Sequence, residues 1–204
     1  MDKELRFDSH LKKMVHQASL RVSALRRVSG HLDRQGILLL YKAQIRPYLE
    51  YAGLTWMSCA GSYKQKLERI ERHAMRLVED PNLPNDQAPP ILDSLEHRRD
   101  VASLVVFHNN KAQIQRVPHL ARLRLPPRVN NRSTRTVLST EELVEVPRSQ
   151  SSQHQRTYPS RVARLWNLFT AAVPSVREMT TQQVKVAAHK WRGTLPTPLL
   201  LLAA

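Results

Sequence analysis

The sequence has few of the residue types from which recognisable sites are built. A single cysteine, Cys59, excludes an internal disulfide framework and a zinc site made of several cysteines. The nine histidines are scattered, and none is followed by another four residues later, so we predict no metal site. The five glycines form no phosphate-binding loop and no dinucleotide fingerprint, and we predict no cofactor.

Long apolar stretches are also missing. The longest runs, Ile37–Tyr41 and Leu199–Ala204, are far too short to span a bilayer, which takes about 20 residues. The N-terminus lacks the apolar segment of a signal peptide. We therefore expect an intracellular protein, nuclear or cytoplasmic, without membrane contact.

Acidic residues are scarce relative to basic ones. The chain has 17 Asp and Glu against 32 Lys and Arg, a formal net charge of +15 and a pI near 10.7. No acidic residue lies between Asp100 and Glu141 or between Glu145 and Glu178, and both stretches contain several arginines. Because arginine pairs well with phosphate, this excess favours nucleic-acid contact. A solubilising surface or a disordered basic tail is the alternative.

Carboxylates are not grouped as polymerase chemistry requires. Clustered carboxylates hold two catalytic metal ions about 4 Å apart in such enzymes. This sequence has no Asp-Asp pair, and its close acidic pairs at 79–80 and 141–142 lie at a predicted helix end and in a weakly patterned segment. We predict no catalytic residue and no enzyme. A nucleophile set built on Cys59 has nothing beyond that cysteine to support it.

Aromatic residues make up only 5% of the chain, too few for a surface dedicated to stacking on single-stranded bases. The candidates lie in apolar helical patterns, which favours core packing over stacking. They are Tyr41, Tyr48, Tyr51, Trp56, Trp166 and Trp191.

Helical periodicity is the strongest positive signal. From Leu11 to Leu25, apolar residues recur at steps of three and four, which indicates a helix with one buried stripe. Asp8 or Ser9 can cap its start, and Gly30 can end it in a left-handed conformation.

Two more helices are predicted before residue 80. Asp33 can cap one of them, and Pro47 then forces a kink or a break after Arg46. Within it, Ile37–Tyr41 is apolar on every side, so we expect this run at the centre of the core. The other helix begins at Gly61 and has its own apolar stripe.

Beyond residue 80 the patterns are weaker. A proline-rich stretch suggests a linker, and the later segments include predicted helices at 94–114, 119–123, 160–169 and 180–191 and short strands at 136–138 and 143–146. The predicted fold is therefore mainly α. It comprises a compact helical unit over 1–80, a linker over 81–93, and a looser helical region over 94–204 with a few short strands and partial disorder in 126–158.

Two blocks of the sequence resemble a known family. LLYKAQIRPYLEYAGLTW (39–56) and LERIERHAMRLV (67–78) are similar, in order and separation, to the region just after the palm in jockey-type non-LTR retrotransposon reverse transcriptases. Segments 5–11, 95–101 and 164–167 are similar to neighbouring parts of that C-terminal region. The resemblance thus covers most of the chain.

This resemblance implies that 1–80 is a thumb-like unit, which in such enzymes holds the template–primer duplex by its backbone. The family's catalytic carboxylates and endonuclease lie upstream of the part represented here, so no catalytic residue is carried over. We expect a truncated fragment of an RNA-directed DNA polymerase that lacks the palm and retains sequence-independent binding to RNA or DNA duplexes. The missing palm is a further expected partner.

The predicted nucleic-acid contacts are nine basic residues of the first unit. They are Arg26, Arg27, Lys42, Arg46, Lys64, Lys66, Arg69, Arg72 and Arg76. Two other interpretations stay open: a helical protein-interaction module whose apolar faces once packed on the palm, and a non-functional relic. An independent enzyme is the third.

Overall fold

The computed structural model describes residues 7–80, 92–114, 143–148, 150–196 and 199. The chain divides into two compact units, unit 1 (Met1–Leu95) and unit 2 (Glu96–Ala204). The prediction of a mainly α fold is confirmed, and no strand forms among the described residues. Most of the predicted linker, the helix expected at 119–123 and the strand expected at 136–138 lie outside these residues.

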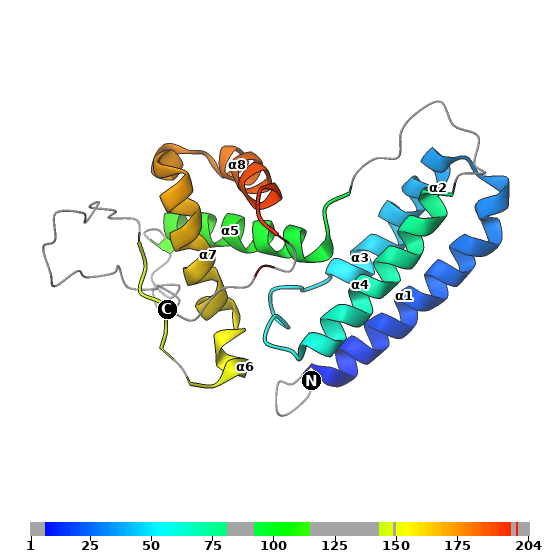
Figure 1. Ribbon diagram of the computed structural model, residues 1–204, viewed down its shortest axis with the longest axis horizontal. Helices are drawn as coiled ribbons and strands as arrows, with labels where there is room; N and C mark the ends of the chain where they lie inside the picture. The colour runs from blue at the N-terminus through cyan, green and yellow to red at the C-terminus, as the bar shows by residue number, and fades with distance from the viewer. Residues whose placement is uncertain (1–6, 81–91, 115–142, 149, 197–198, 200–204) are drawn as a thin grey trace, which may run out of the picture. The chain divides into compact units, whose positions relative to one another are not determined.

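In the described part of unit 1 the helices form three rods, which lie side by side (Figure 1). The first is α1 (Asp8–Val28), and the third is α4 (Gly61–Val78). The middle rod is composite, with α2 (Arg34–Leu40), the π-helical turn η2 (Tyr41–Ile45) and α3 (Arg46–Glu50) in succession. A 3-10 turn, η1 (Ser29–His31), follows α1.

Of the helix caps predicted for α1 and α2, only the one at Asp33 is confirmed. Asp33 caps α2, and its carboxylate accepts a hydrogen bond of 2.8 Å from the Gly36 N–H. The caps predicted for α1 are wrong: the helix already includes Asp8 and Ser9, and Phe7 occupies the cap position without a side-chain bond. Gly30 is not left-handed either, because η1 continues the helical path through it.

Pro47 is accommodated by a change of helical pitch rather than by a break. Proline has no N–H with which to bond the carbonyl four residues earlier. The chain widens into a π turn just before it, and the Arg46 N–H bonds the Tyr41 carbonyl five residues back. The rod therefore continues past the proline as α3.

The core of unit 1 is a single apolar cluster shared by the three rods. Its members from the helices are Leu11, Met14, Ala18, Leu25, Ile37, Tyr41, Ile45, Leu49, Leu67, Ile70, Ala74 and Val78. The expectation that 37–41 is buried all round is wrong at Leu39, whose side chain is 67% exposed. A helix in a three-rod bundle has one face without a neighbour, and Leu39 lies there.

Two polar side chains connect α4 to the middle rod from within. The Arg34 Nε donates a 2.8 Å hydrogen bond to the carbonyl of Val78, one of the last carbonyls of α4, which have no partner inside the helix. The Tyr41 hydroxyl donates a 2.9 Å bond to the buried Glu71 carboxylate. Both bonds fix the position of α4 along the middle rod.

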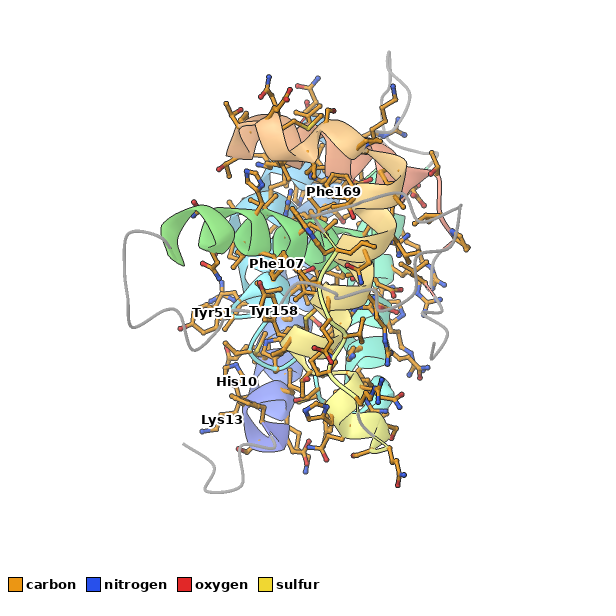
Figure 2. The ribbon with its side chains drawn as sticks, turned by 90° about the vertical axis from the view of Figure 1, so that its left-hand side faces the viewer. His10, Lys13, Tyr51, Phe107, Tyr158 and Phe169 are labelled. Atoms are coloured by element: carbon orange, nitrogen blue, oxygen red, sulfur yellow. The ribbon has the colours of Figure 1, made fainter. Side chains whose placement is uncertain are left out.

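Core packing is confirmed for Tyr41, Trp56 and Trp166, and Trp191 is half-buried. It is wrong for two tyrosines of unit 1. Tyr51 follows the end of α3 and is 67% exposed, with its ring centroid 6.3 Å from that of His10 (Figure 2). Tyr48 lies on the outer side of α3, where the Arg21 guanidinium covers its ring.

Unit 2 packs three main helices around an aromatic centre. These are α5 (Leu95–Ile114), α7 (Tyr158–Ala172) and α8 (Thr181–Gly193), with a short α6 (Ser152–Gln155) and a 3-10 turn η4 (Pro174–Glu178). Trp166 touches Phe107 edge-on at 5.0 Å between ring centroids and Phe169 at 6.2 Å (Figure 2 labels both phenylalanines). Edge-to-face contacts of this kind favour one arrangement of the rings.

The strand predicted at 143–146 does not form. Instead, the backbone of Val144 is paired by a side chain: its N–H donates to Asn167 Oδ1 and its carbonyl accepts from Asn167 Nδ2, each at 2.9 Å. The amide of Asn167 thus satisfies both backbone groups of Val144, which has an isolated bridge and no strand around it. In the same predicted disordered stretch, the polar residues of α6 form a helical turn.

A buried ion-pair network holds α8 and α7 to α5. Asp100, at 0% exposure, accepts from Arg192 Nε at 2.9 Å and from Arg161 at 2.8 Å. Arg161 also pairs with Glu96 at 3.0 Å. The absence of acidic residues between Glu145 and Glu178 favoured phosphate contact for the arginines there. The structure instead pairs one of them, Arg161, with Asp100 and Glu96 inside unit 2.

We expect Asp100→Asn to destabilise unit 2 by about 3–5 kcal/mol, because it leaves the fully buried Arg192 without a countercharge. Hydrogen exchange of α7 and α8 peptides measures this loss, since local protection reports unit stability. Glu178→Gln, on the exposed end of η4, is the control. Equal protection in the two variants would contradict the assignment.

Alkaline pH should weaken unit 2 through Tyr158. Burial raises the pKa of Tyr158 to about 12, from 10.0 in the unfolded chain. The folded state therefore keeps a proton that the unfolded state releases, so stability falls as the pH rises above 10. Urea midpoints at pH 8 and pH 11 should differ less for Tyr158→Phe than for the unaltered chain, and an equal difference would refute this origin.

Candidate nucleic-acid interface

The nine basic residues predicted to contact nucleic acid all lie on the helices of unit 1. Two are on α1, two on the η2–α3 segment and five on α4. Both α1 and α4 carry five basic residues, against one acidic residue on α1 and two on α4. Positive charge is thus concentrated on two helices that pack against each other.

Three arginines of α4 lie on the face away from the core. Arg69, Arg72 and Arg76 each follow a buried core residue of α4 by two positions. Two positions turn a helix by about 200°, so the arginines point away from the apolar stripe. All three are exposed. The apolar pattern that buries one side of α4 therefore aligns the arginines on the other.

A cleft of about 470 Å³ opens between α1 and α4. It is lined by Ser19, Val22, Ser23 and Arg26 of α1 and by Ile70, His73, Arg76 and Leu77 of α4. Later residues of α1 lie against later residues of α4, so the two helices run in the same direction, as Figure 1 shows. Their C-terminal ends are adjacent.

The two guanidinium groups of this cleft are not neutralised. Within the described residues, the side chains of Arg26, His73 and Arg76 have no ion pair or hydrogen bond. The C-terminal ends of the helix dipoles stabilise the two arginines in place, even without a ligand. An anion entering the cleft would find two guanidinium groups with all of their donors available.

The cleft serines contribute less. The hydroxyl of Ser19 donates to the Val15 carbonyl at 2.8 Å, and that of Ser23 donates to the Ser19 carbonyl at 3.0 Å. Their protons are thus committed to the helix backbone. The two arginines, rather than the serines, are therefore the cleft residues with side-chain donors available to an anion.

Some of the other predicted residues are exposed, and others already interact with neighbouring side chains. Arg27 and Lys42 are exposed, and the Lys66 ammonium lies 5.4 Å from the ring centroid of Tyr63. Arg46 is half-buried and pairs with Glu50 at 2.9 Å, four residues along the same helix. Lys64 is half-buried and also engaged. The structure therefore assembles Arg26 with the α4 arginines and leaves Arg46 and Lys64 less available.

The sequence did not single out His73 or Arg21. His73 lies four residues after Arg69 on α4, and this spacing was the available signal. The Arg21 guanidinium carbon lies 4.0 Å above the Tyr48 ring, and the side chain donates to Gln44 at 2.9 Å. Both partners are neutral, so Arg21 adds its charge to the surface of α1.

Comparison with protein-family models, curated proteins and solved structures finds no match for this chain. Among the described residues, no helix combines the length and the apolar character needed to cross a membrane.

Inorganic phosphate should stabilise unit 1 through this cleft. Binding to the folded state alone adds about 1.4 kcal/mol at ten times Kd. Hydrogen exchange of α1 and α4 peptides in phosphate, relative to chloride at equal ionic strength, measures the gain. We expect Arg26→Gln/Arg76→Gln to lose it.

Lys12→Gln/Lys13→Gln removes the same charge from exposed positions of α1 and serves as the matched control. Phosphate also stabilises proteins generally by exclusion from their surface, and both variants keep that part. An equal response of the two variants would show that the cleft does not bind the anion.

Proposed function

We propose that unit 1 binds the phosphate backbone of a nucleic-acid duplex without reading its sequence. The observation that carries the proposal is the pair of unneutralised guanidinium groups in the α1–α4 cleft, continuous with the exposed arginines of α4. Arginine pairs with phosphate in a planar, two-bond geometry. Contacts to phosphate position a protein on nucleic acid and carry no sequence information.

The length of the arginine row suits a nucleic-acid strand. Arg69 and Arg76 are seven residues apart, about 10 Å along the helix axis. A DNA strand rises about 3.4 Å along the duplex axis per phosphate, so the row has the length of about three such steps. Arg26, across the cleft, extends the contact to one side.

Backbone contact is better supported than stacking on unpaired bases. The large rings of Tyr41 and Trp56 are buried in the unit 1 core. Tyr48 is covered by Arg21. Single-strand binding usually relies on several exposed aromatic side chains in a row, and the described surface of unit 1 offers mainly Tyr51.

The resemblance to the thumb region of retrotransposon reverse transcriptases agrees with this function. We infer that the chain is a part of an RNA-directed DNA polymerase that holds a template–primer duplex and contributes no catalytic carboxylate. The exposed arginines of α4 and the adjacent Arg26 of α1 support this inference, because they give unit 1 a basic surface.

A second candidate is a protein-interaction module, with the polymerase palm as the natural partner. It is favoured by exposed apolar side chains of unit 1, above all Leu20 at 52% and Leu39 at 67% exposure. Light scattering and binding of a hydrophobic dye distinguish the two candidates. A monodisperse chain that binds no dye argues against the interaction module, and an aggregated, inactive chain supports a non-functional relic.

Duplex binding should be measured by fluorescence anisotropy with an RNA–DNA hybrid, a DNA duplex and both single strands. We expect affinity for the duplexes to fall steeply between low and high salt and to be independent of base sequence. The variant Arg69→Gln/Arg72→Gln/Arg76→Gln should bind more weakly and lower the salt slope by about three, close to one per lost phosphate contact.

Arg148→Gln/Lys185→Gln/Lys190→Gln removes the same three charges from exposed positions of unit 2 and is the control for net charge. A salt-independent affinity, or an equal loss in this control variant, would overturn the proposed interface.

A further inference from the structure

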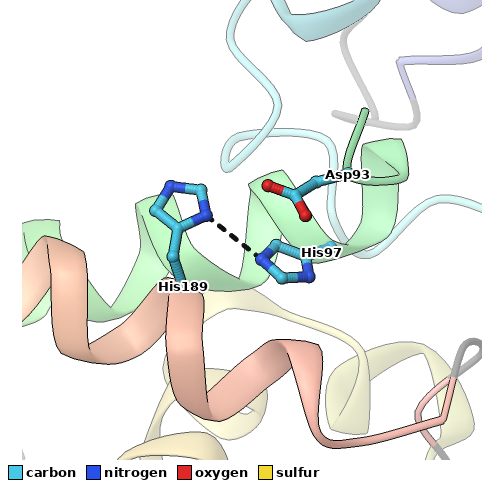
Figure 3. Close-up of side chains that lie close together, drawn as sticks. All are labelled: Asp93, His97 and His189. Atoms are coloured by element: carbon cyan, nitrogen blue, oxygen red, sulfur yellow. Dashed lines mark hydrogen bonds between the residues drawn. The ribbon is translucent and has the colours of Figure 1, made fainter. Parts of the chain in front are cut away.

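Two histidines far apart in the sequence meet in unit 2. His97 lies on the first turn of α5 and His189 on α8. The Nε2 of His97 and the Nδ1 of His189 are 3.1 Å apart, and the rings are stacked with their centroids 5.2 Å apart (Figure 3). His97 is 6% exposed and His189 is half-buried, so the pair borders the surface. Asp93, also labelled there, belongs to unit 1.

The separation of the two nitrogens matches two ligands of one metal ion. Imidazole nitrogens bind zinc at about 2.0–2.1 Å. Two such ligands are then about 3.3 Å apart at a tetrahedral angle and about 2.9 Å apart at a right angle. The observed 3.1 Å lies between these values. A cation could therefore be bound at this separation, with each ring turned so that its lone pair points at the ion instead of along the hydrogen bond.

The helices that carry the pair are fixed one turn away. Asp100 follows His97 by three residues on α5, and Arg192 follows His189 by three on α8. These two residues form the buried ion pair of 2.9 Å. Ligands held this firmly lose little entropy on binding.

We propose that His97 and His189 bind one divalent transition-metal ion, of the class that prefers imidazole, such as Zn²⁺, Cu²⁺ or Ni²⁺. Water completes the coordination. In the hydrogen bond one of the two facing nitrogens carries a proton. On metal binding that proton moves to the other nitrogen of the same ring, so both facing nitrogens present lone pairs and no proton is released. This site is independent of the α1–α4 cleft.

The test is titration of the tag-free, chelator-treated full chain with Zn²⁺ by calorimetry. We expect one ion per chain and loss of at least tenfold in affinity for His189→Gln. The glutamine amide can still hydrogen-bond His97 but is a poor ligand for these ions, so the fold is kept while binding is lost. His16→Gln, exposed on α1, is the control and should bind as the unaltered chain does.

A second measurement needs no variant. In a ¹⁵N-labelled chain, Zn²⁺ should shift the ring nitrogens of two histidines, which His97→Gln and His189→Gln spectra identify. Absence of binding at micromolar Zn²⁺, equal affinity in His189→Gln, or shifts at other histidines would each overturn the proposal and leave the pair as a hydrogen bond between helices. Arg26→Gln/Arg76→Gln should bind Zn²⁺ normally, so failure of the cleft and failure of this site are distinguishable.

Discussion

Burial of one apolar stripe on each of α1 and α4 is the constraint on which unit 1 depends. A fully buried leucine such as Leu11 or Leu67 contributes about 1.5–3 kcal/mol, far more than any surface ion pair. The stripes therefore fix the rotation of both helices about their axes. That rotation determines where the arginines of α4 are exposed, and it also determines the position of the cleft beside Arg26. The basic surface is a geometric result of core packing.

Unit 2 reaches a similar rigidity by another route. Its core combines an aromatic centre around Trp166 with a buried carboxylate, Asp100, shared by Arg161 and Arg192. A buried ion pair adds little net stability relative to apolar packing, but an unpaired member is costly. Other packings of α8 on α5 are thus penalised. Because the Asp100–Arg192 pair fixes how α8 packs on α5, it also holds His97 of α5 opposite His189 of α8.

The helices were predictable because their signal is local. The spacing of apolar residues predicted α1, α4, α5 and α8. The start of α2 was predicted from Asp33, whose side chain can cap a helix. The misses have non-local causes. Leu39 and Tyr51 continue apolar patterns but are 67% exposed, and the backbone of Val144 is paired by Asn167, 23 residues later. Neither circumstance leaves a periodic trace in the sequence.

The candidate sites were predictable to different degrees for the same reason. The arginine row of α4 repeats with the helix and was visible in the sequence. The approach of Arg26 to Arg76 and the meeting of His97 with His189 each join two helices, so composition and spacing could not indicate them. The same holds for Arg161, which an acid-free stretch suggested for phosphate and which the structure pairs with Asp100.

The wide sequence separation of Asp100 and Arg192 also bears on the order in which the two units fold during synthesis. The core of unit 1 is complete at Leu95, so that unit can close early on the ribosome. In unit 2, Asp100 gains its first cationic partner with Arg161, 61 residues later, and its second with Arg192, 92 residues later. The buried carboxylate therefore receives its full set of partners only when α8 has been made. Unit 2 is thus expected to close after unit 1.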